Sequence, residues 1–465
     1  MIKTTLSLAI GILLAGCSLQ PDYQQPTLPV DSQYHAAAAQ QAGNGADIAW
    51  QNFFTDPVMK QLISLALENN RDLRVAALNV DVARSQVQID RAALLPTVSL
   101  SGSETAQHLP GNLYSTKSSG PVTYHQFDTS LGVTSWELDF FGRLRSLRDQ
   151  ALESYLATDA TQRATRISLI SEVASGYLSL CADNALLKLA QQTVQSQQAS
   201  YDLTKRSFDA GVSSDQELAQ AETSVRSAQA DVASYTRQVR KDVNALTLLA
   251  GTRLPSGLLA NAELEKAWSF PATPAGLPSD LLTRRPDIIS AEHTLKAANA
   301  NIGAARAAFF PSISLTASGG SSSNSLGHLL EGGTAAWSFG PSVNLPIFDG
   351  GVNQANLDVA RLQKRIEVAN YEKAIQTAFE EVGDALAGED TWKAELQARQ
   401  QDLAANQRYY HYAEIRFQQG VDNYLNVLVA QRSLYSAQQA AISAQLGQLN
   451  QQVTLYKALG GGWKS

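Results

Sequence analysis

The sequence predicts a mainly α-helical chain with four membrane β-strands, built from two copies of one unit. Three observations favour this fold class: an internal repeat, segments in which apolar and small polar residues alternate, and long stretches without proline or glycine that carry a heptad pattern. The 465 residues are enough for two ordinary domains or for one large elongated one.

The repeat consists of matched segments at a nearly constant offset. Residues 91–100 (RAALLPTVSL) recur as 306–315 (RAAFFPSISL), 215 positions later, and residues 208–212 recur as 417–421, 209 positions later. The offset changes within residues 106–127, which are rich in Gly, Pro, Ser and Thr and are expected to form a loop, where length changes are tolerated. The predicted division is a signal peptide (1–16), an N-terminal segment (17–61), repeat 1 (62–260), a linker (261–276), repeat 2 (277–459) and a C-terminal tail (460–465).

Each copy contains two segments with the alternation of a β-strand. Val98 and Leu100 point to one side of the first strand, and Thr97, Ser99 and Ser101 point to the other. Trp337 and Phe339 alternate with serine and glycine in the same way. Apolar-out, small-polar-in alternation over ~10 residues is typical of a transmembrane barrel strand. In the second strand the phase slips near Ser135, which predicts a β-bulge there.

A soluble sandwich with one wet face is the alternative, and it is less favoured because the rest of this long chain is helical. Four strands cannot close a barrel, and an open sheet edge cannot sit in lipid. Closure needs at least ~8 strands, so several chains must each contribute four. Three chains are favoured over two, because a barrel made by two chains would be filled by its own side chains.

The helical stretches carry seams of apolar residues. Residues 212–249 contain neither proline nor glycine, and Asp242 interrupts the row that accompanies the main seam. Such spacing is typical of coiled-coil packing, which suits a hollow tube and equally a solid bundle. The seam positions are Leu218, Val225, Val232, Val239 and Leu246 in repeat 1, and Leu428, Tyr435, Ile442, Leu449 and Tyr456 in repeat 2.

Composition and motifs argue against catalysis. The net charge of −7 gives a nucleic-acid partner no electrostatic support. The six histidines are scattered, and the sequence has no HExxH pair, P-loop or G-x-S-x-G elbow. We therefore expect no enzymatic activity, no metal and no cofactor.

The first residues are expected to target the chain to a membrane. Lys3 gives a positive n-region, and residues 6–14 form an apolar region that is too short to span a bilayer. The following residues, Leu-Ala-Gly-Cys, resemble a bacterial lipobox, which makes Cys17 the expected lipidation site; Ser18 favours release to the outer membrane. The other cysteine, Cys181, lies in an apolar helical stretch and is expected to be a buried structural thiol.

Longer stretches resemble the TolC/OprM type of outer-membrane efflux channel. They are residues 136–143 (WELDFFGR), 284–288 (RRPDI), 303–312 (GAARAAFFPS) and 456–462 (YKALGGG). The resemblance implies a homotrimer with one twelve-stranded outer-membrane barrel, a periplasmic helical tunnel and an equatorial belt formed by the N-terminal segment and the linker. It also implies a periplasmic adaptor and an inner-membrane proton-driven pump as partners.

The resemblance also implies a periplasmic gate at the start of the last helix. Leu425 would form an apolar ring and Arg432 a polar latch. This family usually carries Asp where Val429 stands. Asp422, expected ten residues before Arg432 on the same helix, is a possible alternative partner for Arg432, and a mainly apolar gate is another option. A solvated charge on a helix is the plain alternative for Arg432.

The two interhelical turns of this family are the expected contacts of the adaptor, although each can equally be a simple turn between helices. The matching residues are Phe208, Gly211 and Val212 in repeat 1, and Arg416, Phe417, Gly420 and Val421 in repeat 2.

The favoured function is therefore that of a passive exit channel for drugs or other small amphiphiles. A duct for secreted proteins or peptides and a non-conducting periplasmic scaffold lipoprotein are the alternatives.

Overall fold

The computed structural model describes residues 18–31, 47–110, 120–264, 270–271, 273–275 and 280–462. They fall into two compact units. Unit 1 comprises residues 1–26, 80–158 and 291–371, and unit 2 comprises 27–79, 159–290 and 372–465, each within the described ranges. Cys17 and the predicted signal peptide lie outside the described residues.

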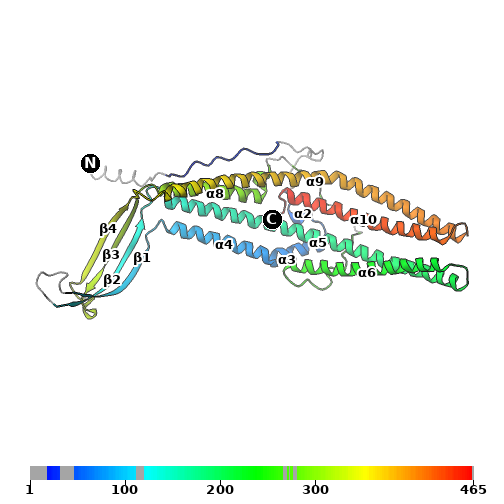
Figure 1. Ribbon diagram of the computed structural model, residues 1–465, viewed down its shortest axis with the longest axis horizontal. Helices are drawn as coiled ribbons and strands as arrows, with labels where there is room; N and C mark the ends of the chain where they lie inside the picture. Colours follow the sequence, from blue (N-terminus) through cyan, green and yellow to red (C-terminus); the bar gives the residue numbers. More distant parts are fainter. Residues whose placement is uncertain are drawn as a thin grey trace. The chain divides into compact units, whose positions relative to one another are not determined.

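The order of elements repeats along the chain (Figure 1). Helix, strand, strand, long helix, helix occurs once as α4–β1–β2–α5–α6 and again as α8–β3–β4–α9–α10, which confirms the predicted fold class. In chain order the described elements are α2 (Trp50–Phe53), α3 (Pro57–Asn69), α4 (Arg71–Ala92), β1 (Val98–Leu109), β2 (Val122–Glu137), α5 (Arg143–Asp209), α6 (Asp215–Ala250), α7 (Leu281–Arg284), α8 (Pro286–Ala307), β3 (Ser312–Ser323), η4 (Leu326–His328), β4 (Ala335–Asn344), α9 (Val352–Gln418) and α10 (Tyr424–Ala458).

The sheet of unit 1 is antiparallel throughout, with strand order β1-β2-β3-β4. Its pairing is regular except between Val133 and Trp136, where the register of β2 against β3 shifts. Ser135 has φ = 53° there, and its N–H donates to Thr316 Oγ1 at 3.2 Å. The predicted bulge is confirmed, and it accounts for the slip in hydrophobic phase along β2.

The helices stop and start at defined residues around the sheet. α4 and α8 end shortly before Pro96 and Pro311, each of which disfavours a helix in the residue before it. At the start of α5, the carboxylate of Asp139 accepts from the N–H groups of Leu144 and Arg145 at 3.1 and 2.9 Å. Such capping satisfies backbone donors that have no partner within the helix.

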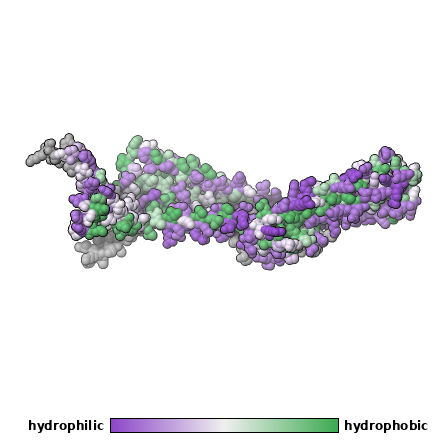
Figure 2. Space-filling model, turned by 90° about the horizontal axis from the view of Figure 1, so that it is seen from below, coloured by the Kyte–Doolittle hydropathy of each residue, from purple (hydrophilic) through white to green (hydrophobic). Residues whose placement is uncertain are grey.

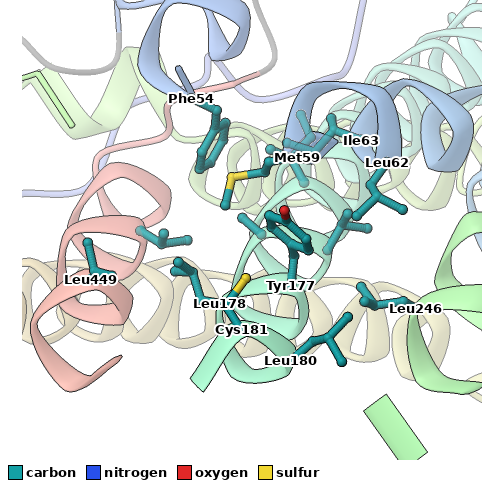
Figure 3. Close-up of a cluster of buried hydrophobic side chains, with 14 of the residues drawn as sticks. Phe54, Met59, Leu62, Ile63, Tyr177, Leu178, Leu180, Cys181, Leu246 and Leu449 are labelled. Atoms are coloured by element: carbon teal, nitrogen blue, oxygen red, sulfur yellow. The ribbon is translucent and has the colours of Figure 1, made fainter. Parts of the chain in front are cut away.

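The core of unit 2 gathers side chains from α3, α5, α6 and α10 (Figure 3). Tyr177 and Cys181 of α5 lie at its centre, and both are buried. Burial raises the pKa of the Cys181 thiol to about 12, so the thiol stays protonated and unreactive, as predicted. The ring of Phe53 stacks on that of Tyr456 with centroids 4.0 Å apart, which joins α2 to α10.

Part of each predicted heptad seam is buried. Val225 and Leu246 are buried on α6, and Leu428, Leu449 and Tyr456 are buried on α10. No helix among the described residues is both long enough and apolar enough to cross a membrane.

Asp242, which interrupts the seam row, lies beside Asp183 of α5. Its Oδ1 accepts from Gln238 Nε2 at 3.0 Å, whereas its buried Oδ2 receives no hydrogen bond from the described residues. Burial, and then the neighbouring Asp242, raise the pKa of the Asp183 carboxyl to about 7. A proton on Asp183 can therefore supply the hydrogen bond that Asp242 lacks.

We expect Asp183→Asn to raise thermal stability at pH 8 and to change it little at pH 4. Because the folded pKa of Asp183 lies above the ordinary value of about 4, its stabilising contribution is complete below that pH and is lost as pH rises through about 7. Thermal unfolding followed by circular dichroism across this range measures the effect. The control is Asp209→Asn at the exposed end of α5. An equal gain in the control, or a gain independent of pH, contradicts the prediction.

Candidate functional site

One face of the sheet in unit 1 is apolar. Because paired residues share a face, the register places Val98, Val133, Ala317 and Phe339 in one row across the four strands. The side chain of Trp337 is 82% exposed on the same face. Large apolar side chains exposed on neighbouring strands of one sheet face require an apolar environment outside the chain.

The other face carries hydroxyl groups. Ser101 Oγ lies 3.0 Å from Ser130 Oγ, and Ser318 Oγ lies 2.8 Å from Ser338 Oγ. This face can be hydrated, and its acidic residues are Asp128 and Glu137. Its hydroxyl-bearing residues are Ser99, Ser101, Ser103, Thr105, Ser130, Ser312, Ser314, Thr316, Ser318, Ser322, Ser338 and Ser342.

Two edges of the sheet and two helix seams have no partner within the described chain. The edges are β1 and β4, whose outer backbone groups face no further strand. Two helices next to these strands in sequence, α4 and α9, carry rows of exposed apolar residues, and Figure 2 shows hydrophobic side chains on the helical surface. The rows are Val75, Leu78, Val82 and Ile89 on α4, and Val352, Val359, Leu362 and Ile366 on α9.

The turn between α5 and α6 in unit 2 contains the first set of predicted adaptor residues. Gly211 has φ = 74°, a conformation that favours glycine, and the N–H of Val212 donates to Ser207 O at 2.8 Å. Val212 is 82% exposed and Phe208 is partly exposed. The structure therefore places the three predicted residues together at one tip.

The turn between α9 and α10 repeats this geometry. Gly420 has φ = 70°, and the N–H of Val421 donates to Arg416 O at 2.9 Å. The ring of Phe417 packs on that of Tyr424 with centroids 5.1 Å apart. Both hairpin turns lie at the same end of unit 2 (Figure 1).

The position predicted for Asp422 is wrong. It precedes α10, because Asn423 caps that helix through its side chain, so Asp422 does not share a helix with Arg432. Its partner is Arg416, whose Nε lies 2.6 Å from Asp422 Oδ2. The hydrogen bond from Arg416 holds the pKa of the Asp422 carboxyl below its usual range, so this pair is charged at neutral pH.

The predicted gate residues lie on the first turns of α10. Leu425 and Val429 are one helical turn apart on the same side, and they are 42% and 44% exposed. Arg432 Nη2 donates to Ser224 Oγ of α6 at 3.2 Å. The described chain thus gives Arg432 a neutral partner in place of a carboxylate.

Sequence reasoning missed a row of hydrogen bonds that continues this contact. The hydroxyl of Tyr435 donates to Asp231 Oδ2 at 3.0 Å, and Gln439 Nε2 donates to the hydroxyl of Tyr235 at 3.0 Å. Burial and the nearby Asp231 raise the pKa of Tyr435, so its hydroxyl remains a donor. A tyrosine within an apolar seam was the available signal, since a buried hydroxyl needs a partner. We call the three contacts between α6 and α10 the α6–α10 ladder.

The N-terminal segment 18–26 in unit 1 is extended and lies along α8. The carbonyls of Leu19 and Pro21 accept from Arg306 Nη1 at 3.1 Å and Asn299 Nδ2 at 2.7 Å. Between these two helix positions stands Gly303, where a Cβ atom would approach the backbone of the segment to 3.0 Å. The segment directly after the predicted lipidation site is therefore held on a helix, a feature that sequence reasoning also missed.

The described residues contain no group of three or more His, Cys, Asp or Glu side chains suited to hold a metal. The geometry offers several surfaces: an apolar and a hydroxyl face on the sheet, two unpaired edges and two exposed helical tips.

Comparisons with known proteins find similar sequences and structures along nearly the whole chain. The family model described as outer membrane efflux protein matches residues 62–252 and 277–461. The chain is 51% identical over 469 residues to the toluene efflux pump outer membrane protein TtgC of Pseudomonas putida, covering 100% of this chain and 96% of that protein. It is 40% identical to the cation efflux system protein CusC of Escherichia coli, covering 99% and 98% of the two chains.

Among solved structures, the open state of the Neisseria gonorrhoeae MtrE outer membrane channel superimposes with a TM-score of 0.88. Its sequence is 39% identical, and the match covers 96% of this chain and 99% of that one.

We expect Tyr435→Phe to loosen the α6–α10 ladder and to favour a more open arrangement of these helices. Loss of one such hydrogen bond costs about 1 kcal/mol, which shifts an equilibrium about fivefold. The fraction of time that the purified protein spends in conducting states in a planar bilayer measures the change. The control is Tyr412→Phe on α9, a residue that is 60% exposed. An unchanged Tyr435→Phe variant, or an equal change in the control, contradicts the prediction.

Proposed function

The chain belongs to the outer membrane efflux protein family and serves as the outer-membrane exit channel of a tripartite efflux pump, and we propose that it conducts drugs or other small amphiphiles. The observation that carries this proposal is the sheet. Its apolar face suits lipid, its hydroxyl face suits a water-filled passage, and its edges are open. The names of the two relatives above refer to efflux of toluene in one case and of cations in the other, so the substrate range varies among them.

A homotrimer explains the open edges. β1 and β4 run antiparallel to each other, so β1 of one copy can pair with β4 of the next and continue the same pattern around a ring. Three copies give twelve strands and a barrel wide enough for an open lumen.

The same closure explains the exposed helix seams. α4 leads directly into β1, and β4 leads into α9, so pairing these strands between copies brings α4 of one copy beside α9 of the next. Both helices carry exposed apolar rows at coiled-coil spacing. A second copy of this chain is the occupant that suits both rows.

The inner-membrane pump and the periplasmic adaptor are the partners we propose beyond the trimer. The two hairpin tips offer exposed apolar side chains at Val212 and Val421, and the α9–α10 tip also carries the ion pair Arg416–Asp422. A periplasmic adaptor with an apolar tip and complementary charges suits this surface.

The outer membrane is the location of the chain, and a lipid on Cys17 is a proposal. Segment 18–26, which directly follows Cys17 in sequence, supports it, because this segment is extended and two of its carbonyls are held by side chains of α8.

A mainly apolar gate is the form that we propose for the closed periplasmic end. Leu425 and Val429 present apolar side chains from the same side of α10, and Arg432 is engaged with Ser224. Three copies would bring these side chains toward one axis.

Deletion of the gene tests the function. We expect the deletion strain to accumulate a fluorescent amphiphilic drug and to become more susceptible to it, with recovery when the wild-type gene is restored. Unchanged accumulation under conditions that induce the pump contradicts the efflux role. A strain that instead loses an exported protein supports the secretion duct.

Cysteine crosslinking tests the trimer. We expect Val82→Cys combined with Val359→Cys to give crosslinked dimers and trimers with a short bismaleimide, because both positions lie in the exposed rows at similar distances from the sheet. The control combines Arg84→Cys, on the far side of α4, with the same Val359→Cys. Equal crosslinking in the control, or monomers only, contradicts the α4–α9 contact. Cys181 is buried, which limits background labelling.

A further inference from the structure

We propose that Asp128 forms a ring of three carboxylates inside the barrel and makes this part of the channel favour cationic over anionic solutes. The inference rests on the proposed trimeric channel, whose lumen is lined by the hydroxyl face of the sheet.

The wall around Asp128 is nearly neutral. The four strands contain no Lys or Arg, and their carboxylates are Glu104, Asp128 and Glu137. Hydroxyl groups can turn either a hydrogen or a lone pair toward a solute, so they do not favour one sign of charge. Any preference of this wall for one sign must therefore come from its carboxylates.

The register assigns each carboxylate to a face. Asp128 pairs with Ser103 on one side and with Ser322 on the other, so it lies on the hydroxyl face. Glu104 pairs with Phe127 in the neighbouring row and lies on the apolar face. The two carboxylates are thus at almost the same level of the sheet but on opposite sides.

Glu137 also lies on the hydroxyl side, since it pairs with Ser314, but its charge is matched. Arg143 donates to both of its oxygens, with Nε at 2.8 Å from Oε1 and Nη2 at 2.6 Å from Oε2. Such a two-point contact neutralises Glu137 locally.

Asp128 is oriented by neutral groups only. Gln126 Nε2 donates to Asp128 Oδ1 at 3.0 Å, and the hydroxyl of Tyr124 donates to Gln126 Oε1 at 2.7 Å. No ion pair is formed by Asp128 within the part of the chain that the structure describes. These contacts fix the position of the carboxylate without cancelling its charge.

Three such carboxylates at one level would produce a strong local field. A passage with low-dielectric walls concentrates the field of the charges that line it. Rings of Asp or Glu select cations in other channels for this reason. The position of Asp128 on β2, towards the end that leads to the β1–β2 loop, places the ring in the half of the barrel farther from the helices.

Reversal potentials in a planar bilayer with a KCl gradient test the proposal, using the full-length channel and also a Leu425→Ser background that loosens the predicted gate. We expect the wild type to favour K⁺, and Asp128→Asn to shift the reversal potential toward zero. Asp128→Lys should shift it further, toward that of an anion-favouring channel. Asp128→Ser should have the same effect as Asp128→Asn. Because serine already occupies the paired positions 103 and 322, this second variant is a control for a folding defect of Asp128→Asn.

The matched control is Glu104→Gln, one row away on the apolar face. We expect its reversal potential to equal that of the wild type. An unchanged potential in conducting Asp128→Asn and Asp128→Ser channels overturns the inference and leaves the channel function standing. A shift in Glu104→Gln alone also overturns it, because the lumen would then be on the other face. A wild type and a Leu425→Ser variant that never conduct overturn the proposed channel itself, and the inference with it.

Discussion

The unpaired backbone of β1 and β4 is the constraint on which the other features depend. In hydrocarbon each exposed N–H or C=O without a partner costs several kcal/mol, and two strand edges expose many such groups. A chain whose described part supplies one open sheet of four strands is therefore incomplete in a membrane by itself. In the proposed trimer, strand pairing between copies would cover the edges and bring the exposed rows of α4 and α9 together, while the apolar face of the sheet would meet lipid.

Away from the membrane, the chain provides its own cohesion. The core around Tyr177 and Cys181 buries side chains from four helices and holds the helical part of unit 2 together within one copy. The α6–α10 ladder adds polar contacts near the predicted gate, where Ser224, Asp231 and Tyr235 each face a residue of α10. Polar contacts can be exchanged for water at a smaller cost than a buried apolar seam, which suits a region that is proposed to open and close.

The sequence predicted those features that follow from local periodicity. The alternation around Val98 and Trp337 located strands, the phase slip located the bulge at Ser135, and the heptads located the buried side of α6 and α10. The ladder could not be predicted, because the pairing of Tyr435 with Asp231 depends on the register between two helices from different repeats. Asp422 was misplaced because the start of α10 is set by the Asn423 cap, and periodicity locates a helix better than it locates its first residue.

The N-terminal segment along α8 has a consequence for how this protein can diverge. Arg306 and Asn299 bind main-chain carbonyls of the segment, and Gly303 makes room for its backbone. The helix thus recognises the course of the polypeptide rather than the identity of residues 19 and 21. The side chains at positions 19 and 21 can therefore change without loss of these contacts, whereas Asn299, Gly303 and Arg306, more than 270 residues downstream, stay constrained.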